Sequence, residues 1–301
     1  MSGKHKHHHE HHTTELLTSN NVTIVFVLNV FFAILEFIFG VLFNSAAVLS
    51  DAVHDTGDAV AIGLAWFFQK YSKKKEDANY TLGYKRFSLL GATITSLILV
   101  VGSIMVMVTS IPRIFFPEAV HTTGIIGLAI FAILMNGFGG WLLSKGTSRT
   151  ESILNLHMLE DVLGWIGVLL VGIVMRFQQW YWLDPLLSVA IAVLILTKAV
   201  PKFIGTLHIF LEKTPENVEY NHLLNELEGL KEVRALTQLL IWSIDGESNA
   251  AMLHLILEES TDISRAKEEV RKVLETHHVG YSAIEIDESV DEHACHLTYK
   301  G

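Results

Sequence analysis

Long apolar segments dominate the first two thirds of the chain, and six of them can be recognised, at residues 22–43, 46–70, 87–112, 120–144, 152–176 and 185–206. Each reaches about 20 residues, which is the length that a helix needs to cross a hydrocarbon core of about 30 Å. Only helices and closed barrels satisfy their backbone hydrogen bonds in lipid, and these segments are too long and continuous for barrel strands. The pattern therefore predicts an α-helical polytopic membrane domain with six transmembrane helices.

Beyond about residue 209 the pattern changes to the short elements of a water-soluble domain. It predicts a small α+β domain in the order αββαβ, with elements near residues 215–228, 236–244, 250–258, 262–277 and 282–287. Three strands bury little apolar surface alone, so dimerisation would help this domain. We expect three regions in all: a disordered tail, the membrane domain and the soluble domain, at 1–20, 21–208 and 209–301.

Charge changes this picture mainly for the soluble domain, where residues 209–301 hold 19 acidic and 8 basic side chains. Such an acidic surface argues against binding to nucleic acid and against lying flat on anionic lipid. The chain has one cysteine, Cys295, so it forms no intrachain disulfide. The tail is rich in histidine, which can gather metal weakly, at His5, His7, His8, His9, His11 and His12.

Basic residues predict the orientation of the membrane domain. They gather in the loops after the second and fourth spans and at the end of the sixth, while the alternate loops carry few. Because cytoplasmic loops are enriched in Lys and Arg, both termini are expected in the cytoplasm. We expect a multi-pass protein of the cell (inner, cytoplasmic) membrane.

Two of the predicted spans carry a histidine and an aspartate four positions apart: His54 with Asp58, and His157 with Asp161. This spacing puts both side chains of a pair on one helix face. Ionisable groups at membrane depth cost roughly 2.5–3.5 kcal/mol each on insertion scales, so they are expected to have a function. Facing each other, the two pairs supply two imidazoles and two carboxylates, a set that suits a tetrahedral divalent cation, above all zinc.

The charge of this four-residue site suggests what else binds there. Two neutral histidines and two carboxylates carry two negative charges, which a divalent cation neutralises in a medium of low dielectric. The empty site can lose its charge by taking up protons instead, and metal and protons compete for the same ligand atoms. This competition is the basis of metal/proton exchange. Asp51 lies near the same face of the second span, where we expect it to orient His54.

Four stretches of the chain are recognisable as a set. The second span reads SAAVLSDAVHDTGD at residues 45–58, and the loop into the third reads YTLGYKRFSLLGA at 80–92. The fifth contains HMLED at 157–161, and the sixth opens with WLDPLLS at 182–188. With these motifs the chain resembles the cation diffusion facilitators, a family of metal/proton antiporters that includes zinc transporters. The resemblance covers nearly the whole chain, from about residue 22 to 287.

This resemblance implies a homodimer of six-helix subunits that works by alternating access, with a metallochaperone-like cytoplasmic domain. It assigns the transport site to the two histidine–aspartate pairs already described. Members with a histidine in both pairs mostly prefer zinc, so Zn²⁺ is the expected substrate here, with a regulatory role in the cytoplasmic domain as a second expectation. Members also use a charge pair near the membrane surface to lock subunits or couple domains, and Arg86 and Glu212 occupy the matching positions.

The soluble domain departs from the family pattern. Many members read HDLHIW before the first strand's tryptophan, whereas this chain reads TQLLIW at residues 237–242, so both histidines are missing. His254 matches a usual ligand position, and Glu285 and Asp287 fall where a histidine and an aspartate often lie. A cytoplasmic metal site formed by these three residues is therefore expected only in weakened form. Two alternatives stay open for the C-terminal tail: it completes the site with Cys295 and His296, or with His293, or it is a free terminus.

Together these features predict a Zn²⁺/proton antiporter that exports metal from the cytoplasm and is not an enzyme. The sequence has no glycine-rich phosphate loop, which argues against an ATP-driven pump. Two alternatives stay open: the same architecture exporting Co²⁺, Cd²⁺, Fe²⁺ or Mn²⁺, since ligand softness separates zinc from cobalt poorly, or a membrane-anchored metal sensor. A metal-dependent membrane hydrolase ranks last, because four protein ligands leave no open coordination position.

Overall fold

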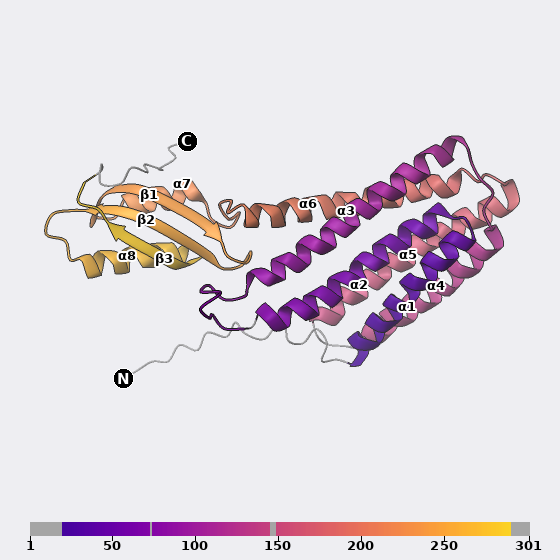
Figure 1. The fold of residues 1–301 in the computed structure, drawn as a ribbon, viewed down its shortest axis with the longest axis horizontal. Helices are drawn as coiled ribbons and strands as arrows, with labels where there is room; N and C mark the ends of the chain where they lie inside the picture. Colours follow the sequence, from indigo (N-terminus) through magenta and orange to yellow (C-terminus); the bar gives the residue numbers. More distant parts are fainter. Residues whose placement is uncertain (1–19, 73, 145–148, 290–301) are drawn as a thin grey trace. The chain divides into compact units, whose positions relative to one another are not determined.

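The computed structural model describes residues 20–72, 74–144 and 149–289 (Figure 1). The chain divides into two compact units. The first contains the residues up to Lys70 together with Gly91–Phe203, and the second contains Tyr71–Leu90 together with the residues from Ile204 onward. The loop before the third long helix therefore belongs to the same unit as the predicted αββαβ domain. The histidine-rich tail lies outside the described residues.

Six long helices correspond to the six predicted apolar segments: α1 (Asn20–Leu42), α2 (Ala46–Ser72), α3 (Arg86–Phe115), α4 (Thr122–Leu143), α5 (Arg149–Gln178) and α6 (Leu183–Phe210). In the part of the chain that is described, five candidate membrane spans are found, within α1 and in α3, α4, α5 and α6. The helix α2 is not among these candidate spans, because Asp51, Asp55 and Asp58 lower the mean hydropathy of its sequence. These polar residues of α2 lie around His54, in the predicted transport site.

The outer surfaces of these helices are apolar. Large side chains such as Phe31, Leu134 and Leu194 are exposed, although water would disfavour a surface of this kind. Lipid tails would cover them at little cost, and polar side chains are gathered on the inner faces instead. Glu36, Asp55 and Asp161, for example, are buried. This inside-out distribution fits a helical bundle in a bilayer.

Small and aromatic residues hold the first unit together. Phe32 of α1 packs edge-on against Trp165 of α5, with ring centroids 5.7 Å apart, in a buried cluster that includes Val48 of α2. The helices α4 and α5 approach closely at Gly139, where an added Cβ would lie 3.3 Å from the sulfur of Met158. Close approach of this kind through small residues is typical of helix packing in membranes.

Hydroxyl groups connect three of the helices. Ser188 of α6 lies 3.0 Å from the hydroxyl of Ser110 of α3, and its carbonyl accepts a hydrogen bond from Ser50 of α2 at 3.4 Å. All three serines are buried. In a bilayer, apolar side chains gain little by leaving lipid for protein, so hydrogen bonds of this kind help to hold the helices together.

The second unit contains a three-stranded sheet in the order β1-β2-β3, with β1 (Val233–Ser243) antiparallel and β3 (Val279–Ile286) parallel to β2 (Asn249–Leu257). The helices α7 (Tyr220–Glu228) and α8 (Ile263–Thr276) complete the predicted αββαβ order. Apolar side chains of both helices join the core of the sheet, among them Leu223, Leu227, Val270 and Leu274.

Local signals explain where these elements begin and end. Asp262 caps α8 by accepting a hydrogen bond from the backbone N–H of Ser264 at 2.9 Å. Gly246, at φ +92°, allows the turn between β1 and β2. The helix α7 starts at Tyr220 and not near residue 215 as predicted. The reason is that the chain after Pro215 makes a turn, in which the Val218 N–H donates to the Pro215 carbonyl at 3.1 Å.

Candidate metal-binding sites

The histidine–aspartate pair of α2 is the first half of the predicted transport site. Nε2 of His54 lies 3.5 Å from Oδ2 of Asp58, and both side chains are about a quarter exposed, at 28% and 25%. One turn of α2 separates the two residues, so their side chains lie on the same face, as the spacing predicts. A nitrogen and an oxygen at this separation suit two ligands of one small cation, since tetrahedral zinc at about 2.0–2.1 Å from each ligand separates them by about 3.3 Å.

The second half of the predicted site lies on α5. Asp161 is buried, and its carboxylate interacts electrostatically with Glu36 of α1 and Asp55 of α2. His157 belongs to the same helix, one turn earlier, but its side chain lies outside the described residues. That all four ligands share one ion therefore stays a prediction.

An acidic cluster lies on the faces of α1 and α2 beside this pair. Glu36, Asp51 and Asp55 each offer a carboxylate oxygen, and these oxygens lie within 4.8 Å of one another. Glu36 and Asp55 are buried and Asp51 is half-buried. Glu36 comes from α1 and the two aspartates from α2, so no spacing along a single helix signals this cluster. The role of Asp51 in orienting His54 stays a prediction.

The three residues predicted for the cytoplasmic site come together on the sheet of the second unit. Nδ1 of His254 lies 3.2 Å from Oδ1 of Asp287, and Nε2 lies 3.7 Å from Oε2 of Glu285. Parallel pairing of β2 with β3 sets His254 opposite Glu285. Both ring nitrogens therefore face carboxylates, and one ligand atom from each of the three residues lies within 4.8 Å of the others. A shared cation would take one ring nitrogen of His254, while the other would bond to a carboxylate.

Thr237 changes the chemistry of this cluster. It stands at the first position of the TQLLIW stretch, and its hydroxyl donates a hydrogen bond to Oδ2 of Asp287 at 2.8 Å. One carboxylate oxygen of Asp287 is thus held by a hydroxyl and the other by His254. The tail residues considered as further ligands, Cys295 and two histidines, lie outside the described residues.

The predicted charge pair also lies within the second unit. Nη2 of Arg86 is 3.5 Å from Oε1 of Glu212, and both side chains are substantially exposed, at 37% and 60%. Nε of Arg86 additionally donates to the backbone carbonyl of Ile244, just after β1, at 3.1 Å. Because exposed ion pairs contribute little, the bond to the carbonyl is the better-defined contact of the arginine. Whether the pair couples domains or subunits stays a prediction.

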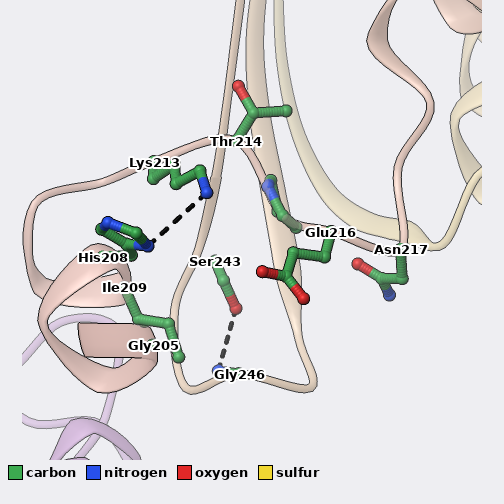
Figure 2. A pocket seen from close by; sticks show the side chains of 10 residues that line it. Gly205, His208, Ile209, Lys213, Thr214, Glu216, Asn217, Ser243 and Gly246 are labelled. Carbon is green, nitrogen blue, oxygen red and sulfur yellow. Dashed lines mark hydrogen bonds between the residues drawn. The ribbon is translucent and has the colours of Figure 1, made fainter. Parts of the chain in front are cut away.

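A cavity of about 340 Å³ lies close by in the same unit, where the last turns of α6 lead toward the sheet. Figure 2 shows His208 and Lys213 on one side of it and Glu216 and Asn217 on the other. Lys213 Nζ lies 3.5 Å from Nδ1 of His208. The lining carries both charge signs, so it does not favour an ion of either sign.

A polar network orders the loop between α2 and α3. The Tyr84 hydroxyl and the Lys74 ammonium donate to Oδ2 of Asp77 at 2.6 and 2.9 Å, and the backbone N–H groups of Asn79 and Tyr80 donate to its Oδ1 at 2.9 and 3.0 Å. These hydrogen bonds, led by that from Tyr84, hold the pKa of Asp77 well below its usual value. The pKa of Lys74 is raised by its hydrogen bonds to Tyr84 and Asp77.

Comparison with known proteins gives a consistent set of relatives. Residues 22–211 match the family described as the cation efflux transmembrane domain. The chain is 32% identical over 295 residues to the cadmium, cobalt and zinc/H(+)-K(+) antiporter of Bacillus subtilis (strain 168), covering 96% of this chain and 93% of that protein. It is 32% identical over 240 residues to the zinc transporter ZitB of Yersinia pestis, covering 78% and 77%.

A further relative is the metal cation efflux system protein CzcD of Cupriavidus metallidurans, 27% identical over 227 residues, which cover 75% of this chain and 72% of that protein. The stretch matched by the family contains both histidine–aspartate pairs.

Proposed function

Because this chain belongs to the cation diffusion facilitator family of cation efflux proteins, we propose that it exports Zn²⁺ from the cytoplasm in exchange for protons. Family membership makes it a multi-pass membrane antiporter for metal cations. The metal, the direction, the counter-ion and the residues involved are the substance of the proposal.

One observation carries the proposal: a histidine nitrogen and a carboxylate oxygen lie 3.5 Å apart on α2, inside a bundle of apolar helices. Membrane helices exclude such groups unless they serve an ion or proton. We assign His54, Asp58, His157 and Asp161 as the ligands of the transported ion. Imidazole and carboxylate together favour zinc over hard cations such as Mg²⁺ and Ca²⁺, which prefer oxygen alone.

Buried negative charge supports the coupling to protons. Glu36, Asp55 and Asp161 are buried and interact with one another, so the region without metal holds several carboxylates that repel each other. A divalent cation or protons relieve this repulsion, and the two cannot use the same ligand atoms at once. Release of the metal on the side of higher acidity is the consequence, and differential affinity between inward-open and outward-open states makes the cycle directional.

Membrane energetics set what the counter-ion must supply. Moving a divalent cation outward against 100 mV, inside negative, costs about 4.6 kcal/mol at roughly 2.3 kcal/mol per charge. One entering proton offsets half of this cost and two offset all of it. The acidic cluster beside the metal ligands has enough carboxylates to take up either one proton or two.

The names of the relatives favour zinc as the main substrate and keep a second candidate open. Zinc appears in the names of the Bacillus subtilis and Yersinia pestis relatives, and cadmium and cobalt appear in that of the Bacillus subtilis protein. Export of Cd²⁺ or Co²⁺ by the same residues is therefore the second candidate. Potassium, also in that name, is an alternative counter-ion.

The cluster of His254, Glu285 and Asp287 is proposed as a regulatory zinc site of the cytoplasmic domain. Its geometry is compact, with both ring nitrogens of the histidine facing carboxylates at 3.2 and 3.7 Å. The domain has a sheet of three strands and buries little surface alone. We propose that it pairs in a homodimer and that both termini lie in the cytoplasm of a cell-membrane protein.

Flux measurements on the purified chain in proteoliposomes test the proposal. Vesicles with an imposed pH gradient are supplied with Zn²⁺, Cd²⁺, Co²⁺ or Mn²⁺ in parallel, with and without a K⁺ gradient. We expect zinc flux that follows the pH gradient and stops when a protonophore removes it. Absence of flux driven by the pH gradient for all four metals would sink the proposal. Zinc flux driven by the K⁺ gradient alone would identify K⁺, and not the proton, as the counter-ion.

A further inference from the structure

A third group of metal-binding side chains lies on the helical side of the second unit, away from the residues assigned above. His222 and Glu226 occupy one face of α7, four positions apart, and His277 follows the last residue of α8. Each offers one ligand atom, and these atoms all lie within 4.8 Å of one another. We propose that these three residues form a zinc site that clamps α7 to the end of α8.

The distances fit a shared ion. Oε2 of Glu226 lies 2.8 Å from Nε2 of His277 and 4.0 Å from Nδ1 of His222. Ligands of tetrahedral zinc, at about 2.0–2.1 Å from the metal, are about 3.3 Å apart, a value between these two distances. The shorter contact is a hydrogen bond through one proton, which zinc would replace. The longer one closes by a small rotation of the exposed His222 side chain, which is 67% exposed.

The scaffold holds two of the three ligands in place before any metal binds. The backbone N–H of His277 donates to the carbonyls of Val273 and Leu274 at 3.3 and 3.1 Å, and its side chain is only 12% exposed. Leu223 and Leu227 anchor α7 in the core. The ring centroids of His222 and His277 lie 5.1 Å apart, with the ring planes tilted by 45° to each other. Preorganised ligands of this kind spare much of the ordering cost of metal binding.

Ligand chemistry selects the metal class. Two imidazoles and one carboxylate are the protein ligands of open zinc sites, in which the fourth position holds water or another ligand. Zinc would leave the group with one net positive charge, which the acidic domain around it, with 19 acidic against 8 basic side chains in residues 209–301, accommodates. Mg²⁺ and Ca²⁺ prefer oxygen ligands and are disfavoured here.

The position of the site gives binding a structural consequence. α7 follows the segment that leads out of α6, and α8 lies between β2 and β3 in the chain. A metal that joins the C-terminal turn of α7 to the end of α8 restrains both helices against the sheet. This restraint is independent of ion flux, so it can be measured by binding and exchange alone.

Hydrogen exchange on the full chain in detergent micelles tests the site, with Zn²⁺ as the probe. The substitutions are His222→Gln, Glu226→Gln and His277→Gln, and the control is His278→Asn, next to the site but with φ +63°, a conformation that asparagine tolerates. In the wild type, zinc is expected to slow exchange in peptides that cover residues 220–228 and 273–278. Each substitution should abolish this protection and lower the bound zinc by one ion per chain.

Co²⁺ supplies a second readout, because tetrahedral coordination gives it an intense visible absorption that His222→Gln should reduce. His222 is exposed, so its substitution leaves the metal-free fold intact, and an unchanged melting curve without zinc checks this. The proposal fails if zinc protects residues 220–228 and 273–278 equally in the wild type and in His222→Gln. It also fails if the control loses protection to the same extent as the site variants.

Discussion

Asp184, in the first turn of α6, accepts a hydrogen bond from the hydroxyl of Ser45 at 2.5 Å, immediately before α2 begins. Its second carboxylate oxygen accepts from the backbone N–H of Ala46 at 2.6 Å. All three residues are buried. The carboxylate therefore caps α2, where the helix dipole favours negative charge. Since α2 carries His54 and Asp58, this contact from α6 helps to position two of the four proposed metal ligands.

Replacing Asp184 should destabilise the membrane unit. Asp184→Asn removes the charge and at least one of the hydrogen bonds to the start of α2, and hydrogen bonds to charged groups contribute roughly 1.5–3 kcal/mol each. We expect a lower midpoint of thermal unfolding in detergent and weaker zinc binding by the membrane unit. Thr197→Ala, an exposed position on the same helix, is the control and should change neither. Equal stability of Asp184→Asn and wild type would contradict the capping role.

The proposed transport ligands can be separated from their neighbours by substitution on α5. Asp161→Asn should reduce pH-driven zinc flux at least about tenfold, since even residues that only support a metal ligand change affinity by 10–100-fold. Glu160 is the matched control, because it is adjacent in sequence but exposed, where it pairs with Lys198 of α6 at 3.1 Å. Glu160→Gln should keep most of the flux. Comparable losses in both variants would argue against Asp161 as a ligand.

Acid should leave the loop between α2 and α3 intact to an unusually low pH. A carboxyl whose pKa is lower in the folded state stabilises that state above its unfolded pKa, about 3.9, and loses this effect as the pH falls through the folded value. The pKa of Asp77 is lowered in this way, first by Tyr84 and then by Lys74. The raised pKa of Lys74 acts in the opposite direction, so its contribution is complete below about 10.4 and is lost at higher pH.

Amide exchange at Asn79 and Tyr80 reports on this loop, because both N–H groups bond to Asp77. After correction for the intrinsic rate, their protection should stay constant from about pH 5 to pH 9, between the two limits just given. Tyr84→Phe should lower the protection and raise the pH at which it is lost on acidification. Glu76→Gln, an exposed neighbour, should behave as wild type. Protection that falls already near neutral pH would contradict the hydrogen-bond network.

The proposed regulatory role of His254, Glu285 and Asp287 predicts a difference between substitutions of His254 and Thr237. His254→Gln removes a proposed ligand, so zinc should no longer raise the melting temperature of the chain through this cluster, and activation of flux by zinc on the cytoplasmic side should weaken. Thr237→Val removes only the hydroxyl that bonds to Asp287. It should destabilise the domain by about 1 kcal/mol and retain the response to zinc. If His254→Gln keeps the response to zinc as Thr237→Val does, the regulatory site is excluded.

The two contacts of Arg86 predict unequal effects of its substitutions. Glu212→Gln removes only an exposed ion pair and should change the stability by less than about 1 kcal/mol. Arg86→Ala also removes the bond from Nε to the Ile244 carbonyl and should have a larger effect on unfolding. If the pair couples domains as family resemblance implies, zinc flux should fall in both variants and recover in the charge exchange of Arg86→Glu with Glu212→Arg. If the charge-swapped variant does not regain flux, the ion pair has no coupling role, and Arg86 acts only through its bond to the Ile244 carbonyl.

The sequence by itself determined the membrane helices, the αββαβ order of the soluble domain and the His54–Asp58 pair. These depend on local periodicity: about 20 apolar residues specify a span, alternation specifies a strand, and a four-residue spacing brings two side chains to one helix face. His222 and Glu226 have the same spacing as His54 and Asp58, so that half of the third site was readable too. In a helix that faces water, however, a histidine and a carboxylate four positions apart are common, so this spacing alone does not predict a metal site.

Only the tertiary structure decided which of these faces meet. His277 joins His222 and Glu226 because α7 and α8 pack on one sheet, and Glu36 reaches Asp51 and Asp55 because α1 lies against α2. Likewise, Asp184 caps a helix that begins 138 residues earlier. The physical reason is that packing of distant elements depends on the shapes of whole helix and sheet surfaces, which no local pattern encodes.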